Sequence, residues 1–448
     1  MDRIDRGQGY SYEPGFPEVR LSTTGYVDLQ DNTKIIVSGS IVYGSLIYKK
    51  AGDLYRAKVN VDIEIINRAD PDQKALSLDY NYSLDSENEN IINSQEVYRF
   101  EQEYDVSPGD YLIRVVVTDL NSEKQTVREA QSSIPDPQGK ISKITEIRVL
   151  GKNSSQQKTT FKPVNTYDIP SKLDSLQFIF QVTNNKEDEQ LTLQARLLRF
   201  ESDTTIARKM NYNNYSPSHI SYKGIDYGEY KVVQSSRRVL NQSGSVLIEF
   251  TFTDLKRGNY RLEVLSEKED DDLYKARDFS VKSKNYPALK TPRELARPLY
   301  YLMGSGTYKK MMSIKSSDSL KSFIDRFWLA NIGNSARARE VISKYYQRVE
   351  SANKQFSNYK EGWKTDMGMI YILFGPPWYT TSFSDEMLWS YSYNRMDPEK
   401  NFLFKRTKLK SKFFPFLNYL LDRKIEYNSL YYNQSSKWRN GLILRDNL

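Results

Sequence analysis

Up to residue 284, the dominant pattern along the chain is the two-residue alternation typical of β-strands. The clearest case is Ala57–Ile65, where apolar side chains occupy every second position and polar or charged ones stand between them. Gly, Asn and Asp clusters separate such runs, which predicts turns between short strands. The first group of predicted strands covers 35–37, 41–43, 46–48, 57–65 and 111–117. This spacing favours an antiparallel β-sandwich over 21–135, after a flexible leader over 1–20.

A second strand-rich stretch follows the breaker Pro135-Asp136-Pro137. Its predicted strands cover 144–149, 176–182, 191–198, 246–252 and 260–264. The segments Ser107–Val115 and Lys256–Val264 each place a Gly turn, one polar residue and a Tyr before an alternating strand. We therefore expect a second copy of the same Ig-like sandwich architecture over 140–284.

After residue 287 the period changes to that of amphipathic helices. The sequence Thr291-Pro292-Arg293-Glu294 is a capping box with Pro at the first helical position. The apolar positions 320, 323, 324, 327 and 328 form one helical face. The sequence Asn331-Ile332-Gly333-Asn334 ends that helix and starts the next, in which helical spacing continues over 342–356. Strand-like runs return at 369–374, 388–393 and 401–404. These elements predict an α+β domain over 288–448.

The amino-acid composition excludes several kinds of catalytic and metal site. The 448 residues include no Cys and a single His, which excludes thiolate nucleophiles, zinc–cysteine sites and multi-histidine metal sites within one chain. We therefore expect no metal and no cofactor. Residues 290–448 carry 27 Lys/Arg against 14 Asp/Glu, so the net charge of +8 is concentrated there. No apolar stretch is long enough for a transmembrane helix, and residues 1–18 lack the apolar core of a signal peptide.

The most distinctive segment runs from Gly362 to Pro377. We expect Trp363 to fill the core, or to stack on a ligand, and Thr365 and Asp366 to cap a turn. A strand over 369–374 would follow and end at the Gly-Pro-Pro turn. The motif residues are Gly362, Trp363, Thr365, Asp366, Gly368, Gly375, Pro376 and Pro377.

This segment resembles the GWxTD-domain family, named for the Gly-Trp-x-Thr-Asp found here at 362–366. The resemblance covers about 290–395 and includes Phe327-Trp328 and the Tyr-Tyr-x-Arg-Val helix at 345–349. Met367 and Met369 depart from the basic residues usual in the family. The family is similar to envelope and exported proteins of Bacteroidota-like bacteria, which implies a periplasmic or outer-membrane location. The resemblance does not supply a reaction.

Three groups of residues are candidates for function. Asp366 could act as a catalytic carboxylate with Glu386 or Asp385, or could cap its turn. Trp389, Tyr391 and Tyr393 could bind a glycan or peptide as one aromatic face, or could form an inward sheet face. A basic run could contact a protein partner or an anionic surface, or could be a solvated loop. Its charged residues are Lys405, Arg406, Lys408, Lys410 and Lys412.

Other features point less clearly to function. The acidic cluster Asp270-Asp271-Asp272 lacks EF-hand spacing and is more typical of a solvated loop than of a Ca²⁺ site. His219 lies in a polar, Tyr-rich segment that suggests simple exposure. Gly304-Ser305-Gly306 is weak evidence for phosphate binding. No motif for nucleic-acid recognition accompanies the basic run, so we expect no nucleic-acid partner.

Tandem sandwiches, abundant tyrosine and few catalytic side chains together favour a non-enzymatic interaction or scaffold protein, and the family resemblance implies that it works in the bacterial cell envelope. It would dock on a protein partner through its C-terminal domain. The alternative is a carboxylate-dependent hydrolase that acts on glycan or peptide through Asp366 and Glu386.

Overall fold

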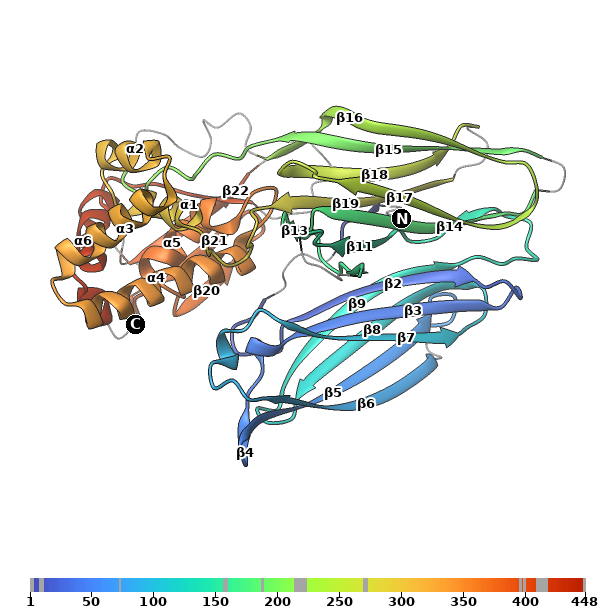
Figure 1. Ribbon diagram of the computed structural model, residues 1–448, viewed down its shortest axis with the longest axis horizontal. Helices are drawn as coiled ribbons and strands as arrows, with labels where there is room; N and C mark the ends of the chain where they lie inside the picture. Colours follow the sequence, from blue (N-terminus) through green and yellow to red (C-terminus); the bar gives the residue numbers. More distant parts are fainter. Residues whose placement is uncertain are drawn as a thin grey trace. The chain divides into compact units, whose positions relative to one another are not determined.

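The chain forms a multidomain, β-rich structure (Figure 1). This computed structural model describes residues 4–7, 12–71, 74–155, 160–186, 189–212, 224–268, 273–394, 397, 400–407 and 418–445. The chain divides into two compact units, the first formed by Met1–Arg199 and Tyr230–Val281 and the second by Phe200–Glu229 and Lys282–Leu448. The division places both strand-rich stretches in one unit, and the predicted domain boundaries stay predictions.

Two sheets enclose the first core of unit one. One sheet has the order β2-β3-β7, and the other has the order β4-β5-β8-β9 with β6 paired to β5. The bounds are β2 (Val19–Val27), β3 (Thr33–Val42), β4 (Lys49–Ala51), β5 (Leu54–Asn67), β6 (Lys74–Ser86), β7 (Val97–Asp105), β8 (Gly109–Asp119) and β9 (Lys124–Ile134). The alternation that predicted β5 buries Val59, Val61 and Ile63 completely or almost so.

The strand predicted at 46–48 is wrong. The short helix η1 (Tyr43–Ser45) precedes this segment, which is irregular up to β4. Leu46 is nevertheless buried in the core between the two sheets. The segment is therefore apolar because it packs against the core, and not because it pairs in a sheet.

Two further sheets enclose the second core of unit one. One has the order β1-β19-β18-β15-β16, with β13 paired to β19, and the other has β10-β14-β11-β12, with β17 paired to β14. Their bounds are β1 (Ile4–Asp5), β10 (Lys143–Ile144), β11 (Arg148–Lys152), β12 (Lys162–Pro163), β13 (Asp168–Pro170), β14 (Ser175–Asn184), β15 (Leu191–Ser202), β16 (Ile225–Leu240), β17 (Gly244–Thr253), β18 (Gly258–Ser266) and β19 (Tyr274–Lys282). Phe178, Phe180 and Phe279 lie at the centre of this core. The β1–β19 pair is parallel, unlike the antiparallel ladders expected from the sequence.

The two sequence segments with a Tyr after a Gly turn have the same local geometry. The hydroxyl of Tyr111 donates to the Ser107 carbonyl at 2.9 Å, and that of Tyr260 donates to the Lys256 carbonyl at 2.6 Å. Both rings are buried. Such a tyrosine corner ties the start of a strand to the turn before it, so the internal similarity has a structural counterpart.

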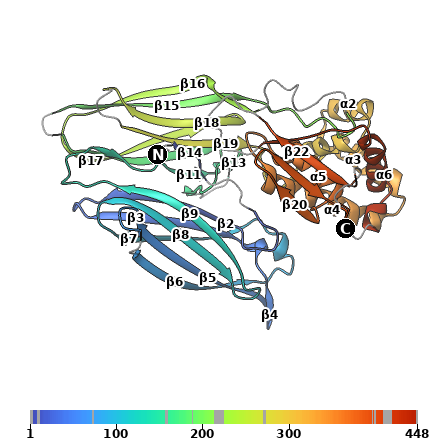
Figure 2. The ribbon, with the colours of Figure 1, turned by 180° about the vertical axis from the view of Figure 1, so that it is seen from behind.

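Unit two combines helices with one four-stranded sheet, of order β20-β21-β22-β23. The helices are α1 (Pro292–Ala296), η5 (Arg297–Tyr301), α2 (Ser305–Ser313), α3 (Ser317–Ile332), α4 (Ser335–Phe356), η6 (Gly362–Lys364), α5 (Asp366–Phe374), α6 (Tyr427–Arg439) and η7 (Leu442–Leu444). The strands are β20 (Tyr379–Ser382), β21 (Glu386–Ser390), β22 (Asn401–Arg406) and β23 (Tyr419–Leu421). Figures 1 and 2, taken from opposite sides, show α4 and α5 against one face of this sheet. No helix in the described residues has the length and apolar character that crossing a membrane requires.

Local signals in the sequence set several of these helix ends. The Thr291 capping box is present, with Glu294 at its third position. Gly333, at a φ of 69°, ends α3, and Asn334 caps the start of α4. These predictions are confirmed, because each depends on contacts within one turn of helix.

The strand predicted over 369–374 is wrong, because these residues belong to helix α5. Nearly every face of this helix is buried, and Met369, Ile370, Ile372 and Leu373 are fully inaccessible to solvent. A helix that is apolar all round shows no 3.6-residue period, so its sequence cannot be distinguished from that of a buried strand.

Candidate functional site

The two glycines of the Gly362–Gly368 segment lie where the backbone packs too closely for a side chain. A Cβ at Gly362 would lie 1.9 Å from the Ala352 carbonyl oxygen, and one at Gly368 would lie 2.0 Å from the Gly362 carbonyl oxygen. The segment between α4 and α5 can therefore pack against the end of α4 only with glycine at both positions.

Trp363 and Thr365 fasten this turn to the core. The indole N–H of Trp363 donates to Glu361 Oε2 at 3.1 Å, and its carbonyl accepts the Tyr301 hydroxyl at 2.8 Å. Its side chain is 3% exposed, so no ligand can stack on it in this structure. The Thr365 hydroxyl donates to the Gly362 carbonyl at 2.7 Å and accepts from the Gly368 amide at 3.0 Å. Thr365 is thus the N-cap of α5.

Asp366 forms a buried ion pair with Arg423, whose Nη2 and Nη1 lie 2.6 and 3.0 Å from Oδ1 and Oδ2 of Asp366. Oδ2 also accepts the Leu421 amide at 2.9 Å. The exposed fractions of the Asp366 and Arg423 side chains are 2% and 0%. Arg423 also donates to the carbonyls of Arg208 and Lys209, at 2.5 and 3.3 Å. The pair therefore links α5, β23 and the inserted segment 200–229, and Asp366 does not cap its own turn.

Asp385 and Glu386 lie at the turn between β20 and β21. The Asp385 carbonyl accepts the Arg406 amide at 2.7 Å, and Glu386 stands opposite Lys405 in the β21–β22 ladder. In the part of the chain that the structure describes, no hydrogen bond or ion pair joins either residue to Asp366. That part also contains no group of three or more His, Cys, Asp or Glu residues able to hold a metal ion.

Side-chain hydrogen bonds also hold the C-terminal end of α5. Its Leu373 carbonyl accepts from Gln434 Nε2 at 2.7 Å, Trp438 Nε1 at 2.9 Å and Arg348 Nη1 at 3.3 Å. Burial lowers the pKa of the Arg348 guanidinium to about 10, so it stays charged at neutral pH and favours the helix C-terminus. Gly375 follows at a φ of +89°. The signal for this contact was the Tyr-Tyr-x-Arg-Val helix, but its partner could not be read from the sequence.

The three aromatic residues proposed as one face are placed differently from one another. Trp389 is 3% exposed, and its ring centre lies 5.0 Å from that of Phe404. Tyr391 is 5% exposed, and its hydroxyl donates to the Gly375 carbonyl at 2.7 Å. Tyr393 is 83% exposed. Strand β21 ends at Ser390, so the alternation of the sequence does not carry Tyr393 onto the same face.

A different set of aromatic side chains is exposed around Tyr393. We call Trp378, Tyr379 and Tyr393 the aromatic cluster; Trp378 and Tyr379 are 41% and 53% exposed. The Tyr393 ring lies 5.2 Å from that of Trp378 and 6.4 Å from that of Tyr379. Phe383, which is 56% exposed, lies at the turn of the same hairpin. Sequence reasoning missed Trp378 and Tyr379, although a Trp-Tyr pair directly after Gly-Pro-Pro was a visible signal.

The basic run is described only in part. Lys405 Nζ lies 3.0 Å from Asp422 Oδ2, and Arg406 ends β22 with an exposed side chain. Lys408, Lys410 and Lys412 lie outside the described residues, as do His219 and Asp270-Asp271-Asp272. Their functional interpretation stays a prediction.

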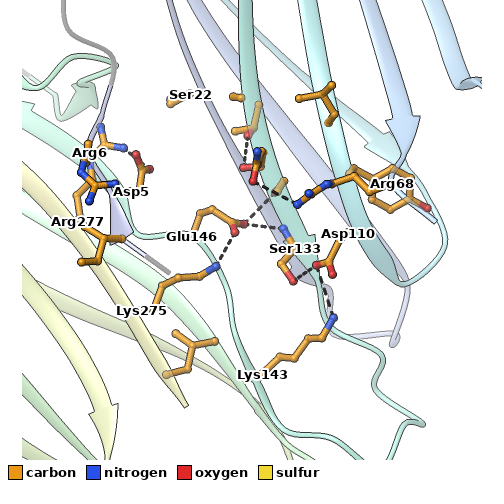
Figure 3. A pocket seen from close by; sticks show the side chains of 18 of the residues that line it. Asp5, Arg6, Ser22, Arg68, Asp110, Ser133, Lys143, Glu146, Lys275 and Arg277 are labelled. Carbon is orange, nitrogen blue, oxygen red and sulfur yellow. Dashed lines mark hydrogen bonds and ion pairs between the residues drawn. The ribbon is translucent and has the colours of Figure 1, made fainter. Parts of the chain in front are cut away.

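Unit one contains a large cleft, of about 910 Å³, lined by strands of both of its cores (Figure 3). Its charges are largely paired. Glu146 accepts from Lys275 Nζ at 2.7 Å and from Ser132 and Ser133, each at 3.0 Å. Asp110 accepts from Ser133 and lies 3.8 Å from Lys143, and Asp5 pairs with Arg277. These contacts hold strands together across the cleft and account for the carboxylates of Glu146, Asp110 and Asp5 without a ligand.

Comparisons with known proteins bear on the C-terminal region. Residues 264–440 match the family model described as GWxTD domain. A comparison with curated proteins found no relative. Among solved structures, red sea bream transglutaminase is 11% identical, with 59% of this chain and 31% of that chain covered, at a TM-score of 0.18. The native conformation of E. coli alpha-2-macroglobulin is 14% identical, with 58% and 16% covered, also at 0.18.

The chain thus spans about a third and a sixth of the length of these two structures, and TM-scores this low carry no argument about fold or function. The family match agrees with the resemblance seen in the sequence, and it begins within β18, before the helical part. Residues 264–440 therefore contain the GWxTD domain that the sequence resemblance indicated.

Proposed function

We propose that this chain is a non-enzymatic interaction protein of the bacterial cell envelope, whose C-terminal unit docks on a protein partner through the aromatic cluster. The observation that carries this proposal is the gathering of Trp378, Tyr379 and Tyr393 at the surface, next to the edge strand β20. Trp and Tyr are enriched at the centres of protein interfaces, where they supply much of the binding energy.

Prolines and hydrogen bonds constrain the backbone that carries the cluster. Pro376 and Pro377 restrict the chain that leads into β20, and the Trp378 amide donates to the Ser390 carbonyl at 2.9 Å. The Tyr391 hydroxyl donates to the carbonyl of Gly375, the residue before Pro376. Side chains held in place before binding lose less conformational freedom when a partner docks, so a rigid aromatic surface favours affinity.

The hydrolase alternative has less support. A general acid or nucleophile must reach substrate, whereas both oxygens of Asp366 are engaged by Arg423 in a buried site. Glu386 and Asp385 belong to a sheet turn and make separate contacts. We therefore do not propose hydrolysis.

In this proposal the two strand-rich halves of unit one are Ig-like sandwiches that act as spacers or adhesive faces. The matching tyrosine corners at Tyr111 and Tyr260 support a common architecture. The periplasmic or outer-membrane location in this proposal is what the family resemblance implies. The partner is a protein of the same compartment, and a glycan or anionic surface is the competing ligand class.

Capture from the envelope fraction of the native host tests the proposal. The full chain is compared with the double variant Trp378→Ser/Tyr393→Ser and with the control Ile425→Ser, which changes a side chain 73% exposed in the same unit. We expect the same cross-linked partner from the wild type and the control, and at least a tenfold lower yield from the double variant at equal thermal stability. Equal capture by all three proteins would contradict the proposal.

A further inference from the structure

Unit two contains a cavity of about 250 Å³ that is separate from the aromatic cluster. Its walls come from residues 209–212, from the start of α2 and from α6. Lys209, Ser305, Tyr431, Ser435 and Arg439 are among its lining residues. No carboxylate is present among the described residues that line it.

Two positive charges at the cavity have no negative partner among the described residues. Lys209 is only 5% exposed, and its ammonium donates to the Met303 carbonyl and lies 5.1 and 5.8 Å from the ring centres of Tyr300 and Tyr431. Arg439 donates to the Ser435 carbonyl at 3.3 Å. Within the described ranges, neither cation forms an ion pair. Buried charges in proteins are normally paired, so the buried charge of Lys209, with the half-buried Arg439 near it, leaves room for an anion.

The helix that opens at this cavity adds to the same field. Gly304 is the N-cap of the nine-residue helix α2 and provides no side-chain cap, and both Gly304 and Ser305 line the cavity. The first amides of a helix carry partial positive charge and bind anions. The cavity also contains Asn211 Oδ1, a buried acceptor that has no hydrogen-bond partner in the described part of the chain.

We propose that this cavity binds a small organic molecule carrying a phosphate or carboxylate group, with the oxyanion between Lys209, Arg439 and the start of α2. The volume exceeds that of an inorganic oxyanion and leaves space for an attached group. A hydroxyl on that group would satisfy Asn211 Oδ1. Tyr212 and Tyr432, which are 42% and 58% exposed, line the same cavity and offer ring surface to the rest of the ligand.

Protonation of Lys209 sets the pH range of binding. Burial, and secondarily the charge of Arg439, lower the pKa of Lys209 to about 8. The groups that face its ammonium are Arg439 and Tyr431 of α6 and Tyr300 of η5. Lys209 therefore remains mostly charged at pH 7 and loses its charge as the pH rises above 8. A bound anion favours the charged form and raises this pKa.

Isothermal titration calorimetry on the full chain tests the site. The probes are inorganic phosphate, glycerol 3-phosphate, glycerate and acetate. The two phosphates are compared with the two carboxylates, and in each pair the simple anion is compared with one that carries a hydroxylated group. We expect one binding site per chain. Glycerol 3-phosphate should bind more tightly than inorganic phosphate, or glycerate should bind more tightly than acetate. Absence of saturable binding of all four probes would overturn the proposal.

Three variants locate the binding. Lys209→Met and Arg439→Gln should each lower the affinity for the tightest-binding probe about tenfold or more, because a hydrogen bond to a charged group is lost. Lys424→Gln removes an exposed Lys of the same unit and should leave affinity unchanged. Equal loss in all three variants would mean nonspecific attraction to a basic surface and would overturn the assignment. Thermal unfolding of each variant without ligand verifies that it is folded.

Sulfate, whose charge is constant above pH 4, serves as the probe for the pH test. Its affinity for the wild type should fall as the pH rises from 7 to 9.5, and this fall should be absent in Lys209→Met. The same decline in both proteins would contradict a role for Lys209. Because Lys209 and Arg439 lie outside the aromatic cluster, the outcome is independent of the proposed docking function.

Discussion

The GWxTD segment and the aromatic cluster lie in the same unit, but they differ in what their side chains contact. From Gly362 to Gly368, the motif's side chains and backbone are buried and bonded within the protein. In the cluster, Trp378, Tyr379 and Tyr393 keep much of their surface in solvent. The segment that defines the family therefore builds the unit, and the exposed aromatic side chains begin ten residues downstream at Trp378.

Two buried cations of the unit, Arg423 and Lys209, also differ in what they contact. Arg423 is paired with Asp366 and tied to two carbonyls of the inserted segment. Lys209, in that same segment, has a carbonyl and two aromatic rings around its ammonium. A paired charge serves the fold, whereas a charge without a counter-ion beside a cavity is available to a ligand.

The largest expected effect comes from breaking the buried ion pair. Asp366→Asn should lower the free energy of unfolding by about 3–5 kcal/mol, because it leaves the Arg423 charge buried and uncompensated. Urea denaturation of the full chain measures it. Asp385→Asn, at an exposed turn, is the control and should stay within about 0.5 kcal/mol. A stable Asp366→Asn protein would show that the pair does not support the fold.

The next effect concerns the close contacts of the motif glycines. Gly362→Ala places a methyl group 1.9 Å from the Ala352 carbonyl oxygen. Because the backbone must then move, the free energy of unfolding should fall by about 1–3 kcal/mol or more. Gly306→Ala, inside α2 with open space around the new Cβ, should instead stabilise by roughly 0.5–1 kcal/mol. Thermal unfolding compares the two, and equal effects would argue against tight packing at Gly362.

A smaller effect is expected from the cap of α5. Thr365→Ala removes the acceptor for the Gly368 amide and should lower stability by about 1 kcal/mol. Thr365→Ser keeps the hydroxyl and should retain most of that stability. Chemical denaturation of both variants measures the difference, and identical losses would show that the methyl group matters more than the cap.

The smallest effect on stability should come from the cluster itself. Tyr393→Ser should change the free energy of unfolding by less than about 0.5 kcal/mol, because the ring is 83% exposed. Tyr391→Phe, two residues earlier, removes a buried hydrogen bond to Gly375 and should cost about 1 kcal/mol. If Tyr393→Ser proves the more damaging change, the cluster belongs to the fold and the contrast with the motif fails.

Local and periodic signals in the sequence were sufficient to predict much of the fold. The alternation of β5, the apolar face of α3 and the caps at Thr291 and Gly333 all depend on neighbouring residues. Helix α5 was mistaken for a strand because it is buried on nearly every side. The helical face of α3 was visible because its other side stays in solvent.

The site was less predictable, because its contacts join residues far apart in the sequence. Arg423 lies 57 residues after Asp366, and no local pattern links them. The segment 200–229 interrupts one unit and contributes to the other, which alternation cannot reveal. Tyr393 was predicted with Trp389 and Tyr391, but the end of β21 at Ser390 separates it from them.

Site-specific photo-cross-linking tests the central claim most directly. A photoreactive amino acid replaces Tyr393 in one full-length protein and Ile425, which is 73% exposed, in another, and both are irradiated in cells of the native host. We predict a discrete adduct with one envelope protein from position 393 that disappears when Trp378→Ser is added, and no such adduct from position 425. The same adducts from both positions, or none from position 393, would contradict the assignment of the aromatic cluster as the docking surface.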